Sequence, residues 1–154
     1  MKVLTTILLM TLTVFSSCSK DEDSKDSSND SFFVKIDNID YNPEFINGFI
    51  VGLGNNISIS GSESNGNNVV IIVPVDAKLG DVYTVEGLDF VASFDNANGD
   101  AIIAKEGSII ITSHDMDTKR ISGTFNFVGK QIIDDGKSFS FTQGKFNVAY
   151  KEIL

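Results

Sequence analysis

The sequence is poor in the residue types on which disulfide frameworks, metal sites and catalytic triads depend. Its 154 residues include one cysteine, one histidine, two prolines and no tryptophan. A lone cysteine excludes an intrachain disulfide and a zinc cluster built from cysteines. A lone histidine excludes His-pair zinc sites and argues against most Ser-His and Cys-His catalytic arrangements. The lack of tryptophan weighs mildly against a sugar-binding surface.

Positive charge is also scarce. The chain has 12 basic and 21 acidic residues, for a formal net charge of −9. A nucleic-acid partner calls for a basic stripe, so we expect none. Hydrophobic residues make up 42% of the chain. This fraction is enough for one packed domain and too high for a chain that is disordered throughout.

Residues 1–17 are predicted to form a secretory signal peptide. Lys2 is followed by a stretch from 3 to 15 that is apolar except for Thr, and then by Ser16 and Ser17. A charged start, an apolar middle and a small-residue end are typical of such signals. A transmembrane anchor is the alternative, but the apolar stretch is shorter than the roughly 20 residues that a membrane helix needs.

The position of the only cysteine makes this prediction more specific. Phe15, Ser16, Ser17 and Cys18 resemble the lipobox of bacterial lipoproteins, although Phe15 stands where Leu is usual. The resemblance implies that Cys18 is diacylated and becomes the mature N-terminus. An ordinary signal peptide cut nearby, leaving a free thiol, is the alternative. The expected partner is a membrane, reached through a lipid anchor of more than one acyl chain.

Residues 18–31 are predicted to be the lipidated cysteine and an acidic, disordered tether. No apolar residue occurs between positions 19 and 30, so this segment has nothing to bury in a core and as a flexible coil spans on the order of 20 Å. Lys20, Asp21, Glu22 and Asp23 resemble the signal by which Bacteroidota export lipoproteins to the outer leaflet of the outer membrane. A plain acidic linker is the alternative. We therefore expect a lipid-anchored protein on the outside of the outer membrane.

Residues 32–154 are predicted to form one all-β domain, an antiparallel β-sandwich or a partly open β-barrel of about eight to ten short strands. Helical periodicity is not evident, whereas apolar residues alternate with polar ones in many short segments. Turn signals such as Asp37-Asn38 and Glu106-Gly107 separate these segments. Residues 69–73 are apolar on both faces, which predicts a central strand with Pro74 at its end. The expected strands are 32–37, 45–53, 57–61, 68–74, 82–85, 90–94, 101–104, 108–112, 120–128 and the segment 138–150, whose parts 138–142 and 146–150 are joined by a bulge or separated by a turn.

Two glycines are predicted to have structural roles. Gly123 lies in the inward-facing row of the strand 120–128. Near Gly144 the inward row changes from odd to even positions, which indicates either a bulge within one long strand or a tight turn at Gln143-Gly144. We favour the bulge, because Gln is a poor first residue for a type I′ turn, and we expect Gly144 to supply a positive φ.

The strand segments carry a family resemblance. Residues 121–127, 136–139 and 142–148, with 57–61 and 80–84 upstream, resemble a Bacteroidota lipoprotein family of unknown function, domain of unknown function 6252. The likeness spans most of residues 32–150 and departs from the family's pattern at Asp37-Asn38, where Asp-Gly is usual. It implies a fold and a location, but no mechanism.

Three acidic or histidine-containing segments are candidates for chemistry. His114 beside Asp115 and Asp117 could bind a metal or act as a base, but a turn between two strands is the preferred interpretation. The oxygen-rich loop 95–100 does not match the spacing of an EF-hand, and weak calcium binding stays an alternative. The adjacent acids 134–135 on a glycine-containing turn are expected to be solvated. We therefore predict no catalytic residue, no metal site and no cofactor.

The preferred functional hypothesis is a non-enzymatic accessory or binding domain of unknown ligand, held on the cell surface by its lipid. The alternative is a carrier of a small apolar ligand in a lipocalin-like barrel cavity. A hydrolase would need convergent polar groups, which the sequence does not show.

Overall fold

A computed structural model describes residues 29–53, 55–133 and 136–152, which form eleven strands and no helix. Within these residues no helix is long and apolar enough to span a membrane. The strands are β1 (Ser31–Ile36), β2 (Ile39–Tyr41), β3 (Phe45–Val51), β4 (Asn56–Ser62), β5 (Asn68–Pro74), β6 (Val82–Thr84), β7 (Val91–Asp95), β8 (Ala101–Asp115), β9 (Arg120–Gln131), β10 (Ser138–Ala149) and β11 (Lys151–Glu152).

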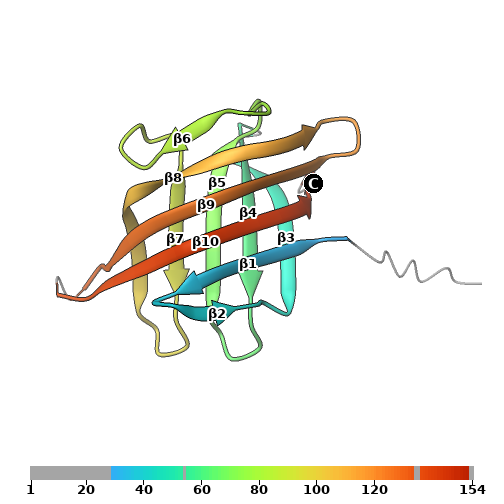
Figure 1. The fold of residues 1–154 in the computed structure, drawn as a ribbon. Helices are drawn as coiled ribbons and strands as arrows, with labels where there is room; N and C mark the ends of the chain where they lie inside the picture. Colours follow the sequence, from blue (N-terminus) through green and yellow to red (C-terminus); the bar gives the residue numbers. More distant parts are fainter. Residues whose placement is uncertain (1–28, 54, 134–135, 153–154) are drawn as a thin grey trace, which may run out of the picture.

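All strands belong to one mostly antiparallel sheet that folds over on itself. Its order is β11-β3-β4-β5-β7-β8-β9-β10-β1-β2, and β6 pairs with β8. Strands β8, β9, β10 and β1 cross in front of β3, β4, β5 and β7 to form a second layer (Figure 1). The predicted all-β class, a sandwich or partly open barrel, is confirmed. β8 is longer than expected, because a bulge lets one strand pair with β7 at its start and with β9 along its length.

The C-terminal strand adds to the β3 edge of the sheet. After β10 the chain continues as β11, which pairs in parallel with Phe49 and Ile50 of β3. The backbone of Gly48 makes this crossing possible, since a Cβ there would lie 2.6 Å from the Ala149 carbonyl oxygen and 2.9 Å from the Tyr150 Cβ. The sheet as a whole stays open: β11 covers only two residues of the β3 edge, and β3 has no partner strand along the rest of that edge.

One long strand replaces two of the expected short ones. The segments 101–104 and 108–112 are joined in β8, so the predicted turn at Glu106-Gly107 is wrong. A register shift between Ala104 and Glu106 marks a bulge instead, and Gly107 has a φ of 140°. The same residue types, Gly above all, occur in turns and in bulges, because in both the backbone leaves the regular β conformation.

The C-terminal bulge is confirmed, but its backbone differs from the prediction. β10 is one strand, with a register shift between Phe141 and Gly144. The positive φ belongs to Gln143, at 55°, and not to Gly144. Gly144 is needed for space, because a Cβ there would lie 2.6 Å from the carbonyl oxygen of Phe125 and 2.7 Å from its ring. Gly123 likewise makes room for the ring of Phe146, which would lie 2.7 Å from an added Cβ.

The first hairpin turns at the expected residues. Asp37 and Asn38 have φ angles of 48° and 67°, the positive values that a two-residue type I′ turn requires and that Asn and Asp tolerate better than most residues. The Asp37 carboxylate accepts a hydrogen bond from the Ser140 amide at 2.8 Å. The turn is therefore tied to β10, and the chain returns as β2, which was too short to predict.

The interior between the layers is filled by aromatic and β-branched side chains. Phe127 and Phe141 stack with ring centroids 4.0 Å apart, and Phe94 meets Phe141 edge-on at 5.7 Å. β5 lies between β4 and β7 and ends at Pro74, as predicted. The buried apolar side chains form one core, made up of Phe32, Val34, Tyr41, Ile57, Ile59, Val69, Ile71, Val73, Ala77, Phe90, Ala92, Phe94, Ile102, Ala104, Ile109, Ile111, Ile121, Phe125, Phe127, Phe139, Phe141, Phe146, Val148 and Tyr150.

Candidate functional site

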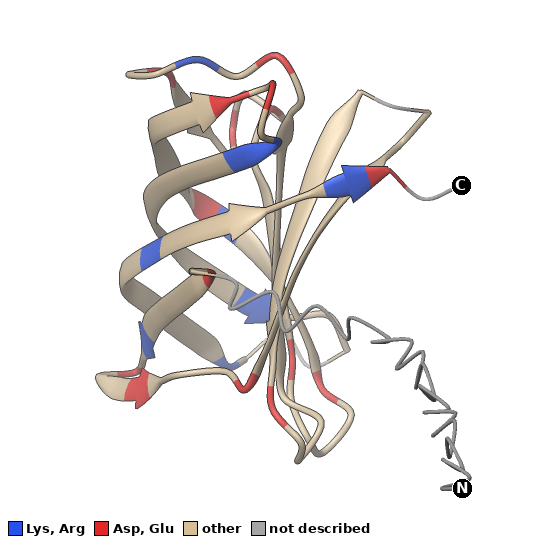
Figure 2. Cartoon of the chain, turned by 90° about the vertical axis from the view of Figure 1, so that its right-hand side faces the viewer, with Lys and Arg blue, Asp and Glu red and all other residues tan. Residues whose placement is uncertain are grey.

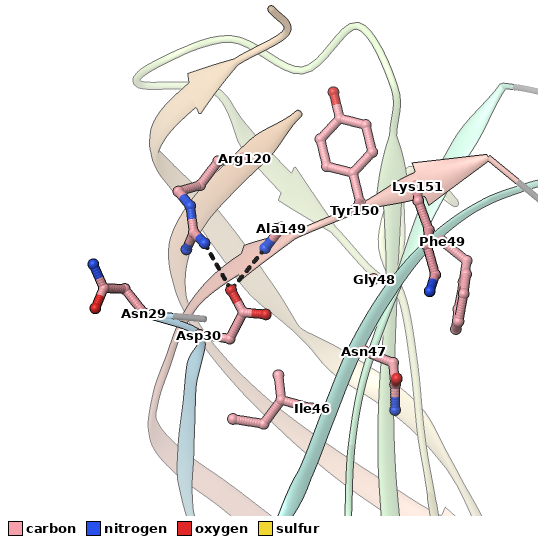
Figure 3. A pocket seen from close by; sticks show the side chains of 10 residues that line it. All are labelled: Asn29, Asp30, Ile46, Asn47, Gly48, Phe49, Arg120, Ala149, Tyr150 and Lys151. Carbon is pink, nitrogen blue, oxygen red and sulfur yellow. Dashed lines mark hydrogen bonds and ion pairs between the residues drawn. The ribbon is translucent and has the colours of Figure 1, made fainter. Parts of the chain in front are cut away.

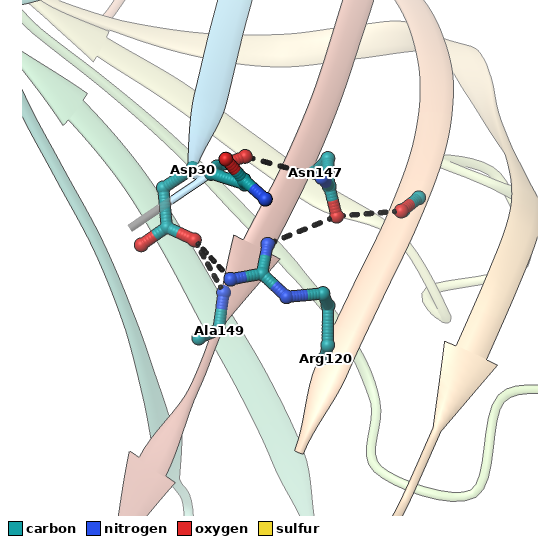
Figure 4. A network of polar contacts seen from close by, with 6 residues as sticks. Asp30, Arg120, Asn147 and Ala149 are labelled. Atoms are coloured by element: carbon teal, nitrogen blue, oxygen red, sulfur yellow. Dashed lines mark hydrogen bonds and ion pairs between the residues drawn. The ribbon is translucent and has the colours of Figure 1, made fainter. Parts of the chain in front are cut away.

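The described chain begins at a polar cluster that fixes it to the domain. Asp30 Oδ1 lies 2.9 Å from Nη2 of Arg120 and accepts the backbone N–H of Ala149 at 3.0 Å (Figure 4). Arg120 begins β9 and Ala149 ends β10, so a single carboxylate oxygen joins three parts of the sequence. Hydrogen bonds to charged groups are among the stronger polar contacts in proteins.

Further hydrogen bonds, all made by Asn147, hold Arg120 and the start of the described chain in place. Asn147 Oδ1 accepts hydrogen bonds from Arg120 Nη1 at 3.2 Å and from the Ser122 hydroxyl at 3.0 Å. The Asn147 amide in turn donates to the carbonyl oxygen of Asn29 at 3.2 Å. Both Asn29 and Asp30 are therefore held against β10, although the sequence analysis placed them in the tether. We call Asn29, Asp30, Arg120, Ser122 and Asn147 the tether latch.

A groove of about 390 Å³ lies between the tether latch and β3. Figure 3 shows Asp30 and Arg120 on one side of it and the strand carrying Asn47 on the other. The Lys151 ammonium sits 5.4 Å from the centre of the Phe49 ring. The groove occupies the incompletely paired edge of the sheet. Its lining residues are Asn29, Asp30, Ile46, Asn47, Gly48, Phe49, Arg120, Ala149, Tyr150 and Lys151.

A second, more apolar cleft of about 320 Å³ lies at the other end of β1, beneath the β1–β2 hairpin. We call it the hairpin cleft. Ile39 is 73% exposed beside it, whereas Phe94 and Phe139 are nearly buried. The lining residues are Ile36, Asp37, Ile39, Asp40, Tyr41, Glu63, Asn67, Phe94 and Phe139. An apolar lining with a few polar groups is the usual character of a small-molecule site.

The Tyr41 hydroxyl fixes one wall of the hairpin cleft. It donates to the carbonyl oxygen of Gly61 at 2.7 Å and lies 3.2 Å from that of Asn67. Burial raises the pKa of Tyr41 well above its usual value, and the negative charge of Glu63 adds to the effect. The phenol therefore stays protonated and keeps the hairpin joined to the β4–β5 connection.

Both ring nitrogens of His114 take part in hydrogen bonds within the domain. Its Nδ1 lies 2.7 Å from the Ala77 carbonyl oxygen and its Nε2 lies 2.9 Å from the Tyr150 hydroxyl. With a neutral ring, Nδ1–H donates to Ala77 and Nε2 accepts from Tyr150. Both ring nitrogens are thus used in joining three segments, and the imidazole has no free nitrogen to act as a base or a ligand.

The neighbouring acids form the turn that the sequence analysis preferred. The Asp115 carboxylate accepts the backbone N–H groups of Asp117 and Thr118 at 2.9 and 3.0 Å. Hydrogen bonds from Thr118 are the main cause of the lowered pKa of Asp115. Among the residues that the structure describes, no three or more His, Cys, Asp or Glu side chains gather as a metal site would require.

The loop 95–100 uses much of its oxygen within itself. Asn96 Oδ1 accepts the amide N–H groups of Asn98 and Asp100 at 2.9 and 3.0 Å. The Asp100 carboxylate accepts from the side chains of Gln131 and Asn96 at 2.6 and 2.8 Å. These hydrogen bonds are typical of a turn that its own side chains stabilise.

Several predicted sites lie outside the described residues, namely Cys18, Lys20, Asp21, Glu22 and Asp23, and so do the acids 134–135. The tether latch was missed by sequence reasoning. Arg120 is the only arginine in the chain, and its guanidinium was the one signal that could have pointed to a partner carboxylate.

The matching family model is described as a domain of unknown function, DUF6252, and covers residues 28–149. The chain belongs to this family. The DUF6252 segment runs from just before the latch to the last residue of β10, so it includes Asp30, Arg120 and Asn147 and leaves out β11. A comparison with curated proteins finds no match.

Proposed function

We propose that this DUF6252 protein is a surface-exposed lipoprotein of a Bacteroidota outer membrane, and that its β-domain is a non-enzymatic binding or accessory domain. The observation that carries the proposal is the lipobox-like segment that ends at Cys18, and the tether latch gives the point of the domain from which the anchor would extend. Asp30 is held by Arg120 and by the Ala149 amide. The lipid at Cys18 is then connected to the domain at a fixed point, the tether latch.

The length of the tether supports this arrangement. Residues 19–28 separate Cys18 from the latch and contain no apolar side chain. The composition of this segment predicts a span on the order of 20 Å. This reach keeps the latch corner near the membrane surface, while the opposite end of β1, with the hairpin cleft, is farther from the anchor.

The chemistry of the described residues favours binding over catalysis. His114 uses both ring nitrogens in structural contacts. The carboxyl pKa is lowered at Asp81, Asp115 and Glu152, chiefly by hydrogen bonds that stabilise the charged form. A general acid at neutral pH requires a raised pKa instead.

The hairpin cleft favours one second candidate function, a carrier of a small apolar ligand. Its Ile and Phe lining suits such a ligand, although the cleft lies at the surface beside the core. Titration with the neutral fluorescent probe N-phenyl-1-naphthylamine tests this candidate. Binding that is weakened by Ile39→Ser and unchanged by Ile110→Ser would support it, and equal binding by both variants would reject the cleft as the site.

Labelling of cells with radioactive palmitate tests the lipoprotein proposal. The wild type should incorporate label and Cys18→Ala should not, and an unlabelled wild type would reject it. Export is tested separately by replacing Lys20, Asp21, Glu22 and Asp23 with Ala and adding protease to whole cells. The replaced protein should stay labelled but become resistant to the protease, and equal cleavage of both forms would overturn the export proposal.

A further inference from the structure

The hairpin cleft combines an apolar surface with negative charge. Phe94 and Phe139 are its nearly buried aromatic members, and Ile39 stands exposed beside them. Figure 2 shows Asp and Glu in the loops at the lower end of the domain, where the β1–β2 hairpin and the cleft lie. None of the described residues that line the cleft is basic, and three are acidic. The acidic ones are Asp37, Asp40 and Glu63.

Two lysines beside the cleft offset part of this charge. Lys35 Nζ lies 2.9 Å from Oδ1 of Asp40, and Lys137 Nζ lies 4.7 Å from the centre of the Phe139 ring. Three carboxylates against these two ammonium groups leave the cleft with a net negative charge. The chain as a whole is also acidic, at −9. The local and the overall charge therefore attract a cation and repel an anion.

The lining side chains that can donate hydrogen bonds already donate within the domain. The Tyr41 hydroxyl donates to the Gly61 carbonyl oxygen at 2.7 Å, and the Asn67 amide nitrogen donates to Oε2 of Glu63 at 2.8 Å. The side-chain oxygen of Asn67 accepts the Ala97 N–H at 2.9 Å. Ionised carboxylates can only accept. A polar ligand group that enters the cleft must therefore bring the donors itself.

Glu63 is the carboxylate best suited to accept them. Two asparagine side chains of the β4–β5 connection donate to its Oε2 at 2.9 and 2.8 Å, and no donor among the described residues reaches its Oε1. Its charge acts on the wall of the cleft, since it is the next cause, after burial, of the raised pKa of Tyr41. The other two carboxylates, of Asp37 and Asp40, already have partners.

We propose that the hairpin cleft binds a small amphiphilic cation, a primary amine on an apolar body, with its ammonium group at Glu63 and its body against Ile39 and the two phenylalanines. An ammonium group supplies both the N–H donors and the positive charge. The volume of about 320 Å³ limits the ligand to a small molecule. The inference rests on the second candidate function, ligand binding in this cleft, and specifies the charge of the ligand. It does not depend on the lipid anchor.

Three naphthalene probes that differ in charge test the proposal. At neutral pH, 1-naphthylmethylamine is a cation, 1-naphthylmethanol is neutral and 1-naphthoate is an anion. In calorimetric titration of the full chain in dodecyl maltoside, corrected with protein-free micelles, the amine should bind about three- to tenfold more tightly than the alcohol, and the naphthoate more weakly than either. Equal affinities of amine and alcohol would overturn the proposal and leave the carrier candidate standing. No binding of any probe would reject both.

Glu63→Gln provides an independent test, because it keeps an acceptor oxygen for the two asparagines and removes the charge. It should weaken binding of the amine about three- to tenfold and change that of the alcohol by less than about twofold. Glu44→Gln is the matched control. Glu44 Oε1 lies 3.4 Å from the hydroxyl of Ser64, the residue after Glu63, but Glu44 does not line the cleft. Thermal melts establish that both variants are folded. Equal losses in the two variants, or unchanged amine binding by folded Glu63→Gln, would contradict the proposed site.

Discussion

The carboxylate of Asp30 meets the guanidinium of Arg120 at 2.9 Å, at the point where the described chain begins. The Asp30 side chain is only 13% exposed, so this pair is closer to a partly buried ion pair than to an ordinary surface one. The same carboxylate oxygen accepts the Ala149 amide. A residue that by composition belongs to the acidic tether is thus part of the folded domain.

Removal of this contact should destabilise the domain. Asp30→Ala leaves the Arg120 guanidinium and the Ala149 N–H without their acceptor, and the expected loss is about 1–2 kcal/mol in the free energy of unfolding, because hydrogen bonds to charged groups contribute roughly 1.5–3 kcal/mol and Arg120 is partly solvated. Urea unfolding measures it.

Asp40→Ala is the matched control for Asp30→Ala. Asp40 pairs with Lys35 at the same 2.9 Å, but its side chain is 57% exposed. Its removal should change the free energy of unfolding by less than about 0.5 kcal/mol. Equal effects of the two substitutions would show that the latch is no stronger than a surface ion pair.

A methyl group at Gly144 should destabilise the domain because it collides with neighbouring atoms, and not because of the backbone conformation at Gly144. Gly144→Ala places a Cβ against the Phe125 carbonyl oxygen and ring. The expected destabilisation is about 1–3 kcal/mol, typical of overpacking. Gly87→Ala is the control, since the nearest atom there is 3.3 Å away. A Gly144→Ala protein as stable as Gly87→Ala would contradict the close approach of β9 and β10.

The buried phenol of Tyr41 should make stability depend on alkaline pH. The folded-state pKa is raised above the unfolded value by burial and by Glu63. The resulting stabilisation is fully present below about pH 10, the unfolded pKa, and is lost as pH rises from there toward the folded pKa. Tyr41→Phe lacks this titration, but it also lacks the hydrogen bond to the Gly61 carbonyl oxygen.

Urea unfolding at two pH values checks this prediction. At pH 7 Tyr41→Phe should be about 1–2 kcal/mol less stable than the wild type, because a buried carbonyl loses its donor. At pH 11 the difference should shrink, since only the wild type loses stability through this phenol. A difference that is constant between the two pH values would mean that the pKa of Tyr41 is not raised.

The sequence was most informative where alternation and turn chemistry agreed. β5 occupies the predicted residues 68–74, and Asp37-Asn38 forms the predicted turn. The division of β8 was wrong because Glu106-Gly107 has the composition of a turn but forms a bulge. The strands β2 and β11 have three and two residues, too few for any periodicity.

The polar contacts were the least predictable part of the site. Asp30 and Arg120 are far apart in the sequence and have no shared motif. They come together only because β10 pairs with β1 on one side and with β9 on the other. His114 reaches Ala77 and Tyr150 for the same reason. Local patterns predict strands, whereas these contacts depend on the long-range order of the strands in the sheet.

The proposed lipid anchor of this DUF6252 domain at Cys18 is tested most directly by mass spectrometry of the N-terminal tryptic peptide from the membrane fraction. Cleavage after Lys20 leaves a peptide of Cys18, Ser19 and Lys20. This peptide should start at Cys18 and carry the mass of a diacylglyceryl group. An N-terminus at another residue, or an unmodified Cys18 thiol, would contradict it.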